Sequence, residues 1–376
     1  MTAKIADVVV LGGGVVGCAT AYYLGKEGKQ VIIIERESVG SHSSGFAYGA
    51  LSPLGGDGIP GPLLPLTIAA MKLHLGLSLS LPQETGIDIQ FRLKPTLSLA
   101  FAEEEAERLK ANFLWQQKQH GYQVEWLEAK ELNDLDPRIS SKALGGVYTE
   151  GTAEVDSYRF ILALAQAAEK YGTVIRHGEI RGLEKDGGGI KVILASGEIV
   201  CQEAVLAMGP WTGSASRWLG QPVPIEPLKG EILRLQAPGP PLQSVIGWAG
   251  NYASTKPDAL IWAGTTEEKV GFDEIPTHAA RDKIMRALLN MLPALGEAQL
   301  IRQTACLRPY CVDGLPIIGQ AYGWESVYLA TGAGRKGILL GPLMGRIVAD
   351  MILKRDIDMP VQPFSPTRFA RTKETD

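Results

Sequence analysis

The sequence has little of what marks a nucleic-acid-binding or disulfide-stabilised protein. Its 376 residues carry 37 basic and 41 acidic side chains, so no strongly basic field exists to attract nucleic acid. Only four cysteines occur, at Cys18, Cys201, Cys306 and Cys311, and their spacing matches no paired metal-ligand pattern. We therefore expect no metal site and a reducing, cytoplasmic environment.

Long hydrophobic runs are also scarce. No basic and apolar leader precedes the first predicted strand, so we expect no secretory signal. The most apolar stretch, residues 63–81, is interrupted by Pro65, Lys72 and His74, which favours a helix packed on a core over a membrane span. A chain of this length suits two domains, or one domain interrupted by another.

What the sequence does contain is a glycine-rich turn near its start. Residues 8–17 read VVVLGGGVVG, a β-branched strand that runs into a turn and then into a helix. Gly12 permits a tight turn, Gly14 lets a pyrophosphate approach the backbone, and Gly17 lets the helix pack closely on the strand. The helix start offers N–H groups and a positive dipole end to phosphates. The next strand ends at Glu35, whose carboxylate would accept hydrogen bonds from an adenosine ribose, so this start predicts a dinucleotide site.

Three further glycine-containing turns indicate which dinucleotide binds. They lie at residues 43–51, 209–211 and 331–338. An extended FAD needs contacts spread along the whole chain, so these turns favour FAD over a nicotinamide cofactor. The last turn opens a helix whose dipole, together with Lys336, would stabilise the negative charge of a reduced flavin. An ordinary strand-to-helix corner is the alternative for that turn.

The remaining pattern predicts an α/β fold with two interleaved domains. The apolar runs 204–208 and 327–331 are each followed by glycine and a helix, so we expect them to join the first strand in one parallel sheet. We also expect Ser157 to cap a helix that ends near Lys170. Segments elsewhere in which apolar and polar residues alternate predict an antiparallel sheet, which would form the substrate-binding domain. The expected division is a discontinuous Rossmann-type FAD-binding domain of residues 1–84, 151–218 and 307–376, and a substrate-binding domain of residues 85–150 and 219–306.

Several motifs follow one another along the whole chain. They are the glycine turn with Glu35, then Ser43-Ser44 with 49–53, and then 155–159, 207–211, 307–319, 334–340 and 364–369. In this order they resemble the D-amino-acid oxidase superfamily of flavoenzymes, especially its glycine oxidase and sarcosine oxidase branches. The resemblance implies an FAD site formed by Gly12, Gly14, Val15, Val16, Gly17, Glu35, Arg36, Ser43, Ser44, Gly49, Ala50, Leu51, Ile180, Gly209, Trp211, Cys306, Gly334, Lys336, Gly337 and Ile338.

The same resemblance implies a group of catalytic residues beside the flavin. It places Arg308 on the carboxylate of the substrate, where a planar guanidinium can form two parallel charge-assisted hydrogen bonds. It also places Tyr252 on that carboxylate, with Arg335 nearby, and it matches Lys336 to a sarcosine oxidase lysine that contacts the flavin and assists the reaction with oxygen. The alternatives are a salt-bridged structural arginine at position 308 and a plain sheet residue at position 252.

Cys306 leaves two interpretations open. It falls in the register of the sarcosine oxidase cysteine that forms a thioether with the flavin, so the resemblance implies either covalent or noncovalent FAD. A thiolate near an electron-poor flavin methyl group could add to it if its pKa is lowered. The alternative is a small buried residue on a strand.

The implied function is the oxidation of the C–N bond of a small amino acid or N-alkyl amino acid. A hydride would move from the α-carbon to flavin N5, and the resulting imine would hydrolyse, with oxygen or another acceptor taking up the electrons. An FAD-dependent 2-hydroxy-acid dehydrogenase and the flavin subunit of a hetero-oligomeric amino-acid dehydrogenase are the alternatives. The sequence leaves the oligomeric state open, a homo-oligomer included.

Overall fold

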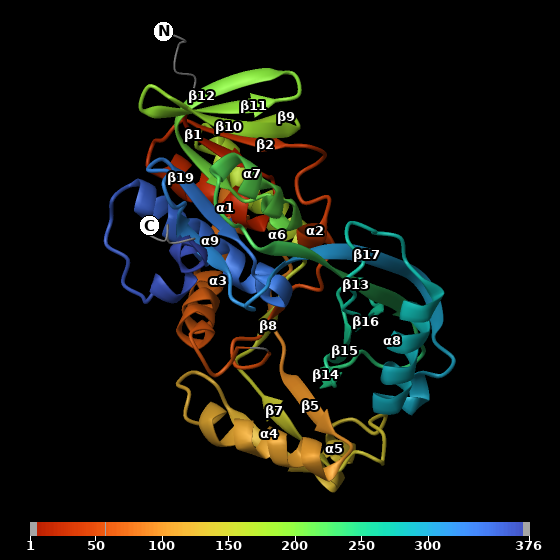
Figure 1. Ribbon diagram of the computed structural model, residues 1–376. Helices are drawn as coiled ribbons and strands as arrows, with labels where there is room; N and C mark the ends of the chain where they lie inside the picture. Colours follow the sequence, from red (N-terminus) through yellow and green to blue (C-terminus); the bar gives the residue numbers. More distant parts are fainter. Residues whose placement is uncertain (1–5, 57, 371–376) are drawn as a thin grey trace, which may run out of the picture.

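The computed structural model describes residues 6–56 and 58–370, and its first large unit is an eight-stranded sheet built on β1 (Figure 1). The strands of this sheet are β1 (Ala6–Leu11), β2 (Val31–Glu35), β9 (Val174–His177), β10 (Ile180–Asp186), β11 (Gly189–Leu194), β12 (Gly197–Leu206), β18 (Ile317–Gln320) and β19 (Val327–Thr331). β1 pairs in parallel with β2 and β12, and β12 pairs in parallel with β19. This confirms the two later strands that the sequence predicts as parallel partners.

Four apolar helices pack together beside this sheet. They are α1 (Val15–Lys26), α3 (Leu63–Thr85), α6 (Ser157–Lys170) and α9 (Gly337–Ile352). Small residues let α1 and α9 approach closely, because a β-carbon added at Gly345 would lie 2.7 Å from the Thr20 nitrogen. The packing of these helices holds the starts of α1 and α9 at fixed places relative to the sheet.

The cap of α6 differs from the prediction by one residue. Asp156, not Ser157, is the N-cap, and its carboxylate accepts a hydrogen bond from the Arg159 N–H at 2.9 Å. The hydroxyl of Ser157 instead donates to the Ala47 carbonyl at 2.9 Å. Both residue types favour this position, so the neighbouring contact with Ala47 decides which of them caps the helix.

The second large unit is an eight-stranded sheet with the order β17-β13-β16-β15-β14-β5-β7-β6. Its strands are β5 (Thr96–Ala100), β6 (Val124–Glu128), β7 (Gly145–Thr149), β13 (Ile225–Gln236), β14 (Val245–Trp248), β15 (Asn251–Thr255), β16 (Ile261–Gly264) and β17 (Gln299–Cys311). The sheet is antiparallel, as predicted, except where β14 and β5 pair in parallel. The expected domain boundary between residues 306 and 307 falls inside β17, which runs through it unbroken.

Smaller elements connect and cover the two large sheets. A three-stranded sheet combines β3 (Ala50–Leu51), β8 (Ala153–Glu154) and β4 (Arg92–Leu93). The other helices are α2 (Ser43–Phe46), α4 (Glu103–Gln116), α5 (Ala129–Leu135), α7 (Ser216–Leu219) and α8 (His278–Met291). Figure 1 shows α8 against the strands of the second sheet and α4 and α5 beside β5 and β7, at the end farthest from β1.

α3 is the one helix in the described part of the chain that is long and apolar enough to cross a membrane by length and composition. Its most apolar window has a mean hydropathy of 1.4, and 39% of that window is buried inside the protein. The buried face, which includes Leu66, Ala70 and Leu81, belongs to the same core cluster as α6 and α9. This is the packing predicted for a core helix.

Candidate active site

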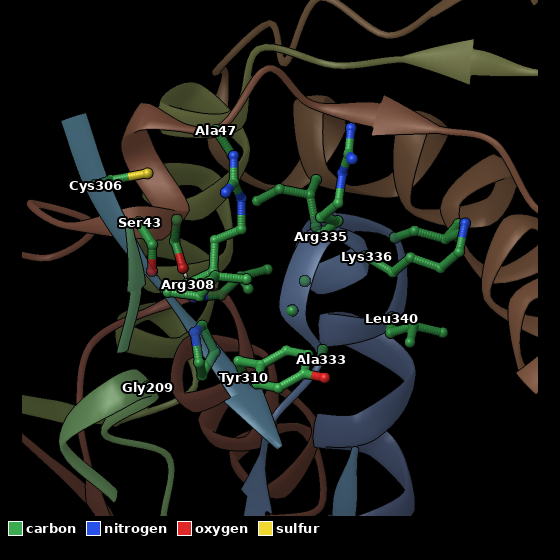
Figure 2. A pocket seen from close by; sticks show the side chains of 18 of the residues that line it. Ser43, Ala47, Gly209, Cys306, Arg308, Tyr310, Ala333, Arg335, Lys336 and Leu340 are labelled. Atoms are coloured by element: carbon green, nitrogen blue, oxygen red, sulfur yellow. Dashed lines mark hydrogen bonds between the residues drawn. The ribbon is translucent and has the colours of Figure 1, made fainter. Parts of the chain in front are cut away.

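A connected cavity of about 1130 Å³ is lined by residues of both large sheets. The residues predicted for the cofactor and the substrate all line it, with two exceptions, Gly17 and Leu51. The cavity therefore joins the glycine turn after β1 to the arginine-bearing face of β17. Figure 2 shows one part of it, with Cys306 and Arg308 on one strand, and Arg335 and Lys336 on the segment that leads into a helix.

The glycine turn forms one end of the cavity. Gly12 has a φ of +109°, which a side chain would rarely tolerate, and a β-carbon at Gly14 would lie 3.2 Å from the Ser44 hydroxyl oxygen. That hydroxyl accepts a hydrogen bond from the Val15 N–H at 3.2 Å. α1 begins at Val15, and Val15 and Val16 line the cavity, so the positive end of the helix dipole lies where the sequence predicts a pyrophosphate.

Glu35 lies beside the same turn. Its carboxylate accepts hydrogen bonds from the Gly13 N–H at 2.7 Å and the Glu37 N–H at 2.9 Å. These two backbone donors fix the carboxylate at the end of β2, where it lines the cavity. This position suits the predicted role of accepting hydrogen bonds from a ribose.

The two exceptions have structural roles. A β-carbon at Gly17 would lie 1.9 Å from the Gly12 carbonyl oxygen, so Gly17 lets α1 pack on β1, as its spacing predicts. Leu51 is fully buried in the core, while Ala50 before it lines the cavity. The side chain of Leu51 therefore does not line the cavity, because alternate residues of β3 face opposite ways, and a contact of Leu51 with the cofactor stays a prediction.

Aromatic and basic side chains cover another part of the cavity wall. The guanidinium of Arg36 lies 4.5 Å from the ring centroid of Trp211, and the His42 ring packs edge-on against the same indole at 4.7 Å. Trp211 belongs to a 3₁₀ helix (Gly209–Ala215) that follows β12. These contacts make Trp211 and Arg36 neighbours, and Ile180, which the resemblance places on the adenine side, lines the same cavity.

The start of α9 forms the opposite wall. A 3₁₀ turn (Gly334–Lys336) precedes the helix, and Lys336, its N-cap, forms no side-chain cap bond. Instead the Lys336 ammonium donates to the Ser52 carbonyl at 3.0 Å. Gly337 and Ile338 line the cavity here, so both the lysine and the positive end of the helix dipole lie beside it.

Arg308 presents a guanidinium to the cavity from β17. One terminal nitrogen, Nη1, donates to the Thr266 carbonyl at 3.1 Å, and the other, Nη2, donates to the Thr265 hydroxyl at 2.6 Å. Within the described residues, no carboxylate lies within ion-pair distance of Arg308. Burial is the main cause that lowers the pKa of Arg308, so an anionic ligand would compensate its desolvated charge.

Tyr252, on β15, also lines the cavity. A β-carbon at Gly264 would lie 3.0 Å from its hydroxyl oxygen, so the neighbouring strand leaves room for this phenol. Burial raises the pKa of Tyr252, which keeps its hydroxyl protonated and able to donate. Its ring packs at 4.7 Å on that of Tyr48, whose own hydroxyl donates to the buried Glu154.

Arg335 spans the cavity between the two units. Its Nη2 donates to the Gly250 carbonyl in the β14–β15 turn at 2.7 Å, and its Nη1 lies 3.6 Å from a Glu267 carboxylate oxygen. The side chains of Arg335 and Glu267 are 39% and 41% exposed, so this ion pair lies at the mouth of the site. The loop that begins at Thr265 thus contacts both arginines, Arg308 through Thr265 and Thr266, and Arg335 through Glu267.

Cys306 lies two residues before Arg308 on the same face of β17. Its side chain is buried and lines the cavity. Burial raises the pKa of the thiol, and the nearby Arg308 charge lowers it by less. The thiol is therefore the favoured form in the protein without a bound ligand.

Comparison with known proteins identifies the family. A family model described as FAD dependent oxidoreductase (DAO) matches residues 7–351. A glycine oxidase of Geobacillus kaustophilus is 31% identical over 366 residues, covering 96% of this chain and 97% of that protein.

The chain belongs to the DAO family of FAD-dependent oxidoreductases. A crystal structure of glycine oxidase from Geobacillus kaustophilus superimposes with a TM-score of 0.93 at 29% identity, covering 97% of this chain and 99% of that chain. Iminodiacetate oxidase from Chelativorans sp. BNC1 shares the fold at a TM-score of 0.89 and 22% identity, over 96% of this chain and 99% of that chain. These findings confirm the α/β fold, the flavoenzyme family and FAD as the cofactor.

The site of this DAO-family chain contains residues that the sequence does not single out. Thr265 and Tyr48 line the cavity, and Gly230 lies directly under the Arg308 guanidinium. Thr265 and Gly230 belong to none of the motifs that the sequence analysis identifies. They lie close to Arg308 because β13 pairs with both β16 and β17. Tyr48 lies within the predicted glycine-containing turn 43–51, and this is the one local signal among the three.

Proposed function

We propose that this protein oxidises the C–N bond of a small amino acid such as glycine, sarcosine or a D-amino acid. The observation that carries the proposal is Arg308, a cavity-lining guanidinium without a carboxylate partner among the described residues. When bound, FAD supplies the chemistry by accepting a hydride from the substrate α-carbon. The imine that remains hydrolyses in water to a carbonyl compound and ammonia or an amine. The glycine oxidases among the relatives support this class of reaction.

The residues of the chain act by binding and orientation. Arg308 holds the substrate carboxylate through its planar guanidinium, which restricts the substrate to a narrow range of orientations. Tyr252 donates its hydroxyl to the same carboxylate, and Arg335 closes the mouth of the site. Lys336 and the start of α9 stabilise negative charge at the pyrimidine side of the cofactor. No residue of the chain needs to form a covalent bond with the substrate.

A 2-hydroxy acid would fit the same carboxylate site, so a 2-hydroxy-acid dehydrogenase is the second candidate. The products distinguish the two activities, because only the oxidation of an amine releases ammonia or an alkylamine. The proposal covers two electron acceptors, oxygen and a partner protein of a hetero-oligomer. A cytoplasmic location and a homo-oligomeric state remain predictions from the sequence.

The decisive experiment mixes FAD-loaded protein anaerobically with glycine, sarcosine, D-alanine and glycolate, and follows the loss of flavin absorbance and the release of ammonia. We expect reduction by at least one amino acid, with a loss of roughly 100-fold in kcat/KM for Arg308→Met because a buried charge-assisted contact is removed. Arg302→Met is the matched control, since Arg302 is an exposed arginine of the same strand. Failure of all three amino acids to reduce the flavin would overturn the proposed activity, and unchanged kinetics in Arg308→Met would remove Arg308 as the anchor of the substrate carboxylate.

A further inference from the structure

The contact between Thr265 and Arg308 has an unusually constrained hydrogen-bond pattern. Thr265 is 7% exposed and follows β16 directly, and its hydroxyl oxygen lies 2.6 Å from Nη2 of Arg308. A guanidinium has only donors, so the hydroxyl must be the acceptor in this bond. The bond therefore uses a lone pair of the hydroxyl and leaves its single proton for another partner.

That proton has a fixed destination. The Thr265 hydroxyl lies 3.0 Å from the Glu231 carbonyl oxygen of β13 and 3.3 Å from the Thr266 carbonyl oxygen. The shorter contact, to Glu231, carries the better hydrogen bond. A hydroxyl that donates to a strand carbonyl and accepts from a guanidinium is held in one orientation, because both of its bonding directions are occupied.

The loop that carries Thr265 is itself tied to β13. The Glu231 N–H donates to the Thr266 hydroxyl at 3.2 Å, and the buried Glu231 carboxylate accepts from the Thr277 N–H at 3.1 Å. β13 therefore holds this loop near both of its ends. The Thr265 hydroxyl is thus a fixed reference point for the Arg308 guanidinium and not a group that moves with it.

We propose that Thr265 is a positioning residue, whose hydroxyl sets the plane in which Arg308 presents its guanidinium to the substrate carboxylate. This inference rests on the proposed function, in which Arg308 binds that carboxylate. Thr265 does not need to touch the substrate. Its removal frees the guanidinium to turn about its side-chain bonds, so the two parallel hydrogen bonds to a carboxylate form less often.

Three variants test this inference in the FAD-loaded protein. Thr265→Val removes the hydroxyl at nearly constant shape, Thr265→Ser keeps it, and Thr304→Val makes the same change at a buried threonine of β17 that forms no described contact with Arg308. The measurements are kcat and KM for glycine, and the dissociation constant of acetate from the change in flavin absorbance. FAD content and the melting temperature are recorded for each variant. If Thr265→Val does not bind FAD, Thr265→Ala is used in its place. Thr265→Ala also removes the hydroxyl and adds no methyl group to the buried site.

We expect Thr265→Val to raise both the KM for glycine and the dissociation constant of acetate by roughly tenfold, because an unrestrained guanidinium must be ordered when the ligand binds. Its kcat should change by less than about threefold, and Thr265→Ser and Thr304→Val should behave like the unmodified protein. Glycinamide, which lacks the carboxylate, should react with Thr265→Val as slowly as with the unmodified protein. A merely structural role for Thr265 would lower activity towards both substrates together.

Acetate binding that is unchanged in Thr265→Val, or not restored in Thr265→Ser, would overturn the inference. Arg308→Met separates this failure from failure of the proposed function. If Arg308→Met loses acetate binding while Thr265→Val keeps it, only the role of Thr265 is wrong. If both variants keep it, Arg308 is not the carboxylate anchor, and the inference about Thr265 falls with it, whereas the proposed oxidation is tested separately by the release of ammonia.

Discussion

The guanidinium of Arg308 occupies the space beside Gly230 of the neighbouring strand that a side chain at position 230 would fill. A β-carbon at Gly230 would fall 2.0 Å from Nη1 and 2.2 Å from Cζ of Arg308, well inside any tolerable contact. In the antiparallel pairing of β13 and β17, Gly230 stands directly opposite Cys306 and diagonally adjacent to Arg308. Because Gly230 has no side chain, the Arg308 guanidinium can lie in this space. Position 230 therefore helps to form the substrate site.

We predict that Gly230→Ala displaces the guanidinium and lowers kcat/KM for the amino-acid substrate by roughly 10- to 100-fold, as expected for a misplaced binding group. FAD binding should persist, because Gly230 does not line the cavity. Steady-state kinetics and the flavin spectrum check both expectations. Gly76→Ala is the control, since a β-carbon there meets nothing within 4 Å. Full activity in Gly230→Ala would mean that the guanidinium can bind substrate from another position.

Arg335 gives a prediction about substrate size. Its guanidinium bonds to the Gly250 carbonyl and so crosses the mouth of the site. We expect Arg335→Ala to raise the preference for bulkier or N-alkylated amino acids over glycine by a few-fold, because it opens that mouth. Competition between glycine and larger amino acids measures this ratio. Glu267→Gln should leave the ratio nearly unchanged, since a half-exposed ion pair at 3.6 Å contributes little. An unchanged ratio in Arg335→Ala would remove Arg335 from the determinants of specificity.

Cys306 gives a prediction about how the cofactor is attached. Burial favours the protonated thiol, and a protonated thiol is a poor nucleophile. We therefore expect acid precipitation of the purified protein to release FAD into the supernatant, and Cys306→Ala to retain cofactor and colour. A pellet that stays yellow in the unmodified protein and turns colourless in Cys306→Ala would instead establish the thioether that the sequence leaves open.

The sequence predicts the nucleotide end of the site better than the substrate end, for a physical reason. Gly12, Gly14 and Glu35 act within one strand–helix–strand unit, so their spacing alone carries the information. Arg308 is identified by a motif, but its partners are distant in the chain: Gly230 lies on β13, and Thr265 lies in the loop after β16. Their contacts depend on the register between β13, β16 and β17, which no local pattern encodes.

His74 is a buried histidine of the apolar helix α3, and it packs against the start of α9. Its Nε2 lies 3.0 Å from the Ile338 carbonyl oxygen and 3.1 Å from that of Leu339, so this nitrogen carries a proton and donates. The other ring nitrogen, Nδ1, is buried without a partner among the described residues. Burial lowers the pKa of His74 from 6.5 to about 4, because a second proton would have no acceptor there.

This shift predicts how stability depends on pH. Below pH 6.5 His74 is protonated in the unfolded chain but stays neutral in the folded protein until the pH approaches 4. The free energy of unfolding therefore falls as the pH falls from 6.5 towards 4. The loss from this one group amounts to roughly 3 kcal/mol at or below the folded-state pKa. Urea unfolding of the FAD-loaded protein at several pH values between neutral and 4 measures it.

His74→Gln should weaken this pH dependence, because glutamine does not titrate, although the variant is expected to be less stable at neutral pH. His120→Gln, at an exposed position, should keep the full dependence. If unmodified protein and His74→Gln lose the same free energy between neutral pH and 4, then His74 accepts a proton in the folded state. The start of α9, against which His74 packs, would then have to rearrange in acid to provide an acceptor for Nδ1.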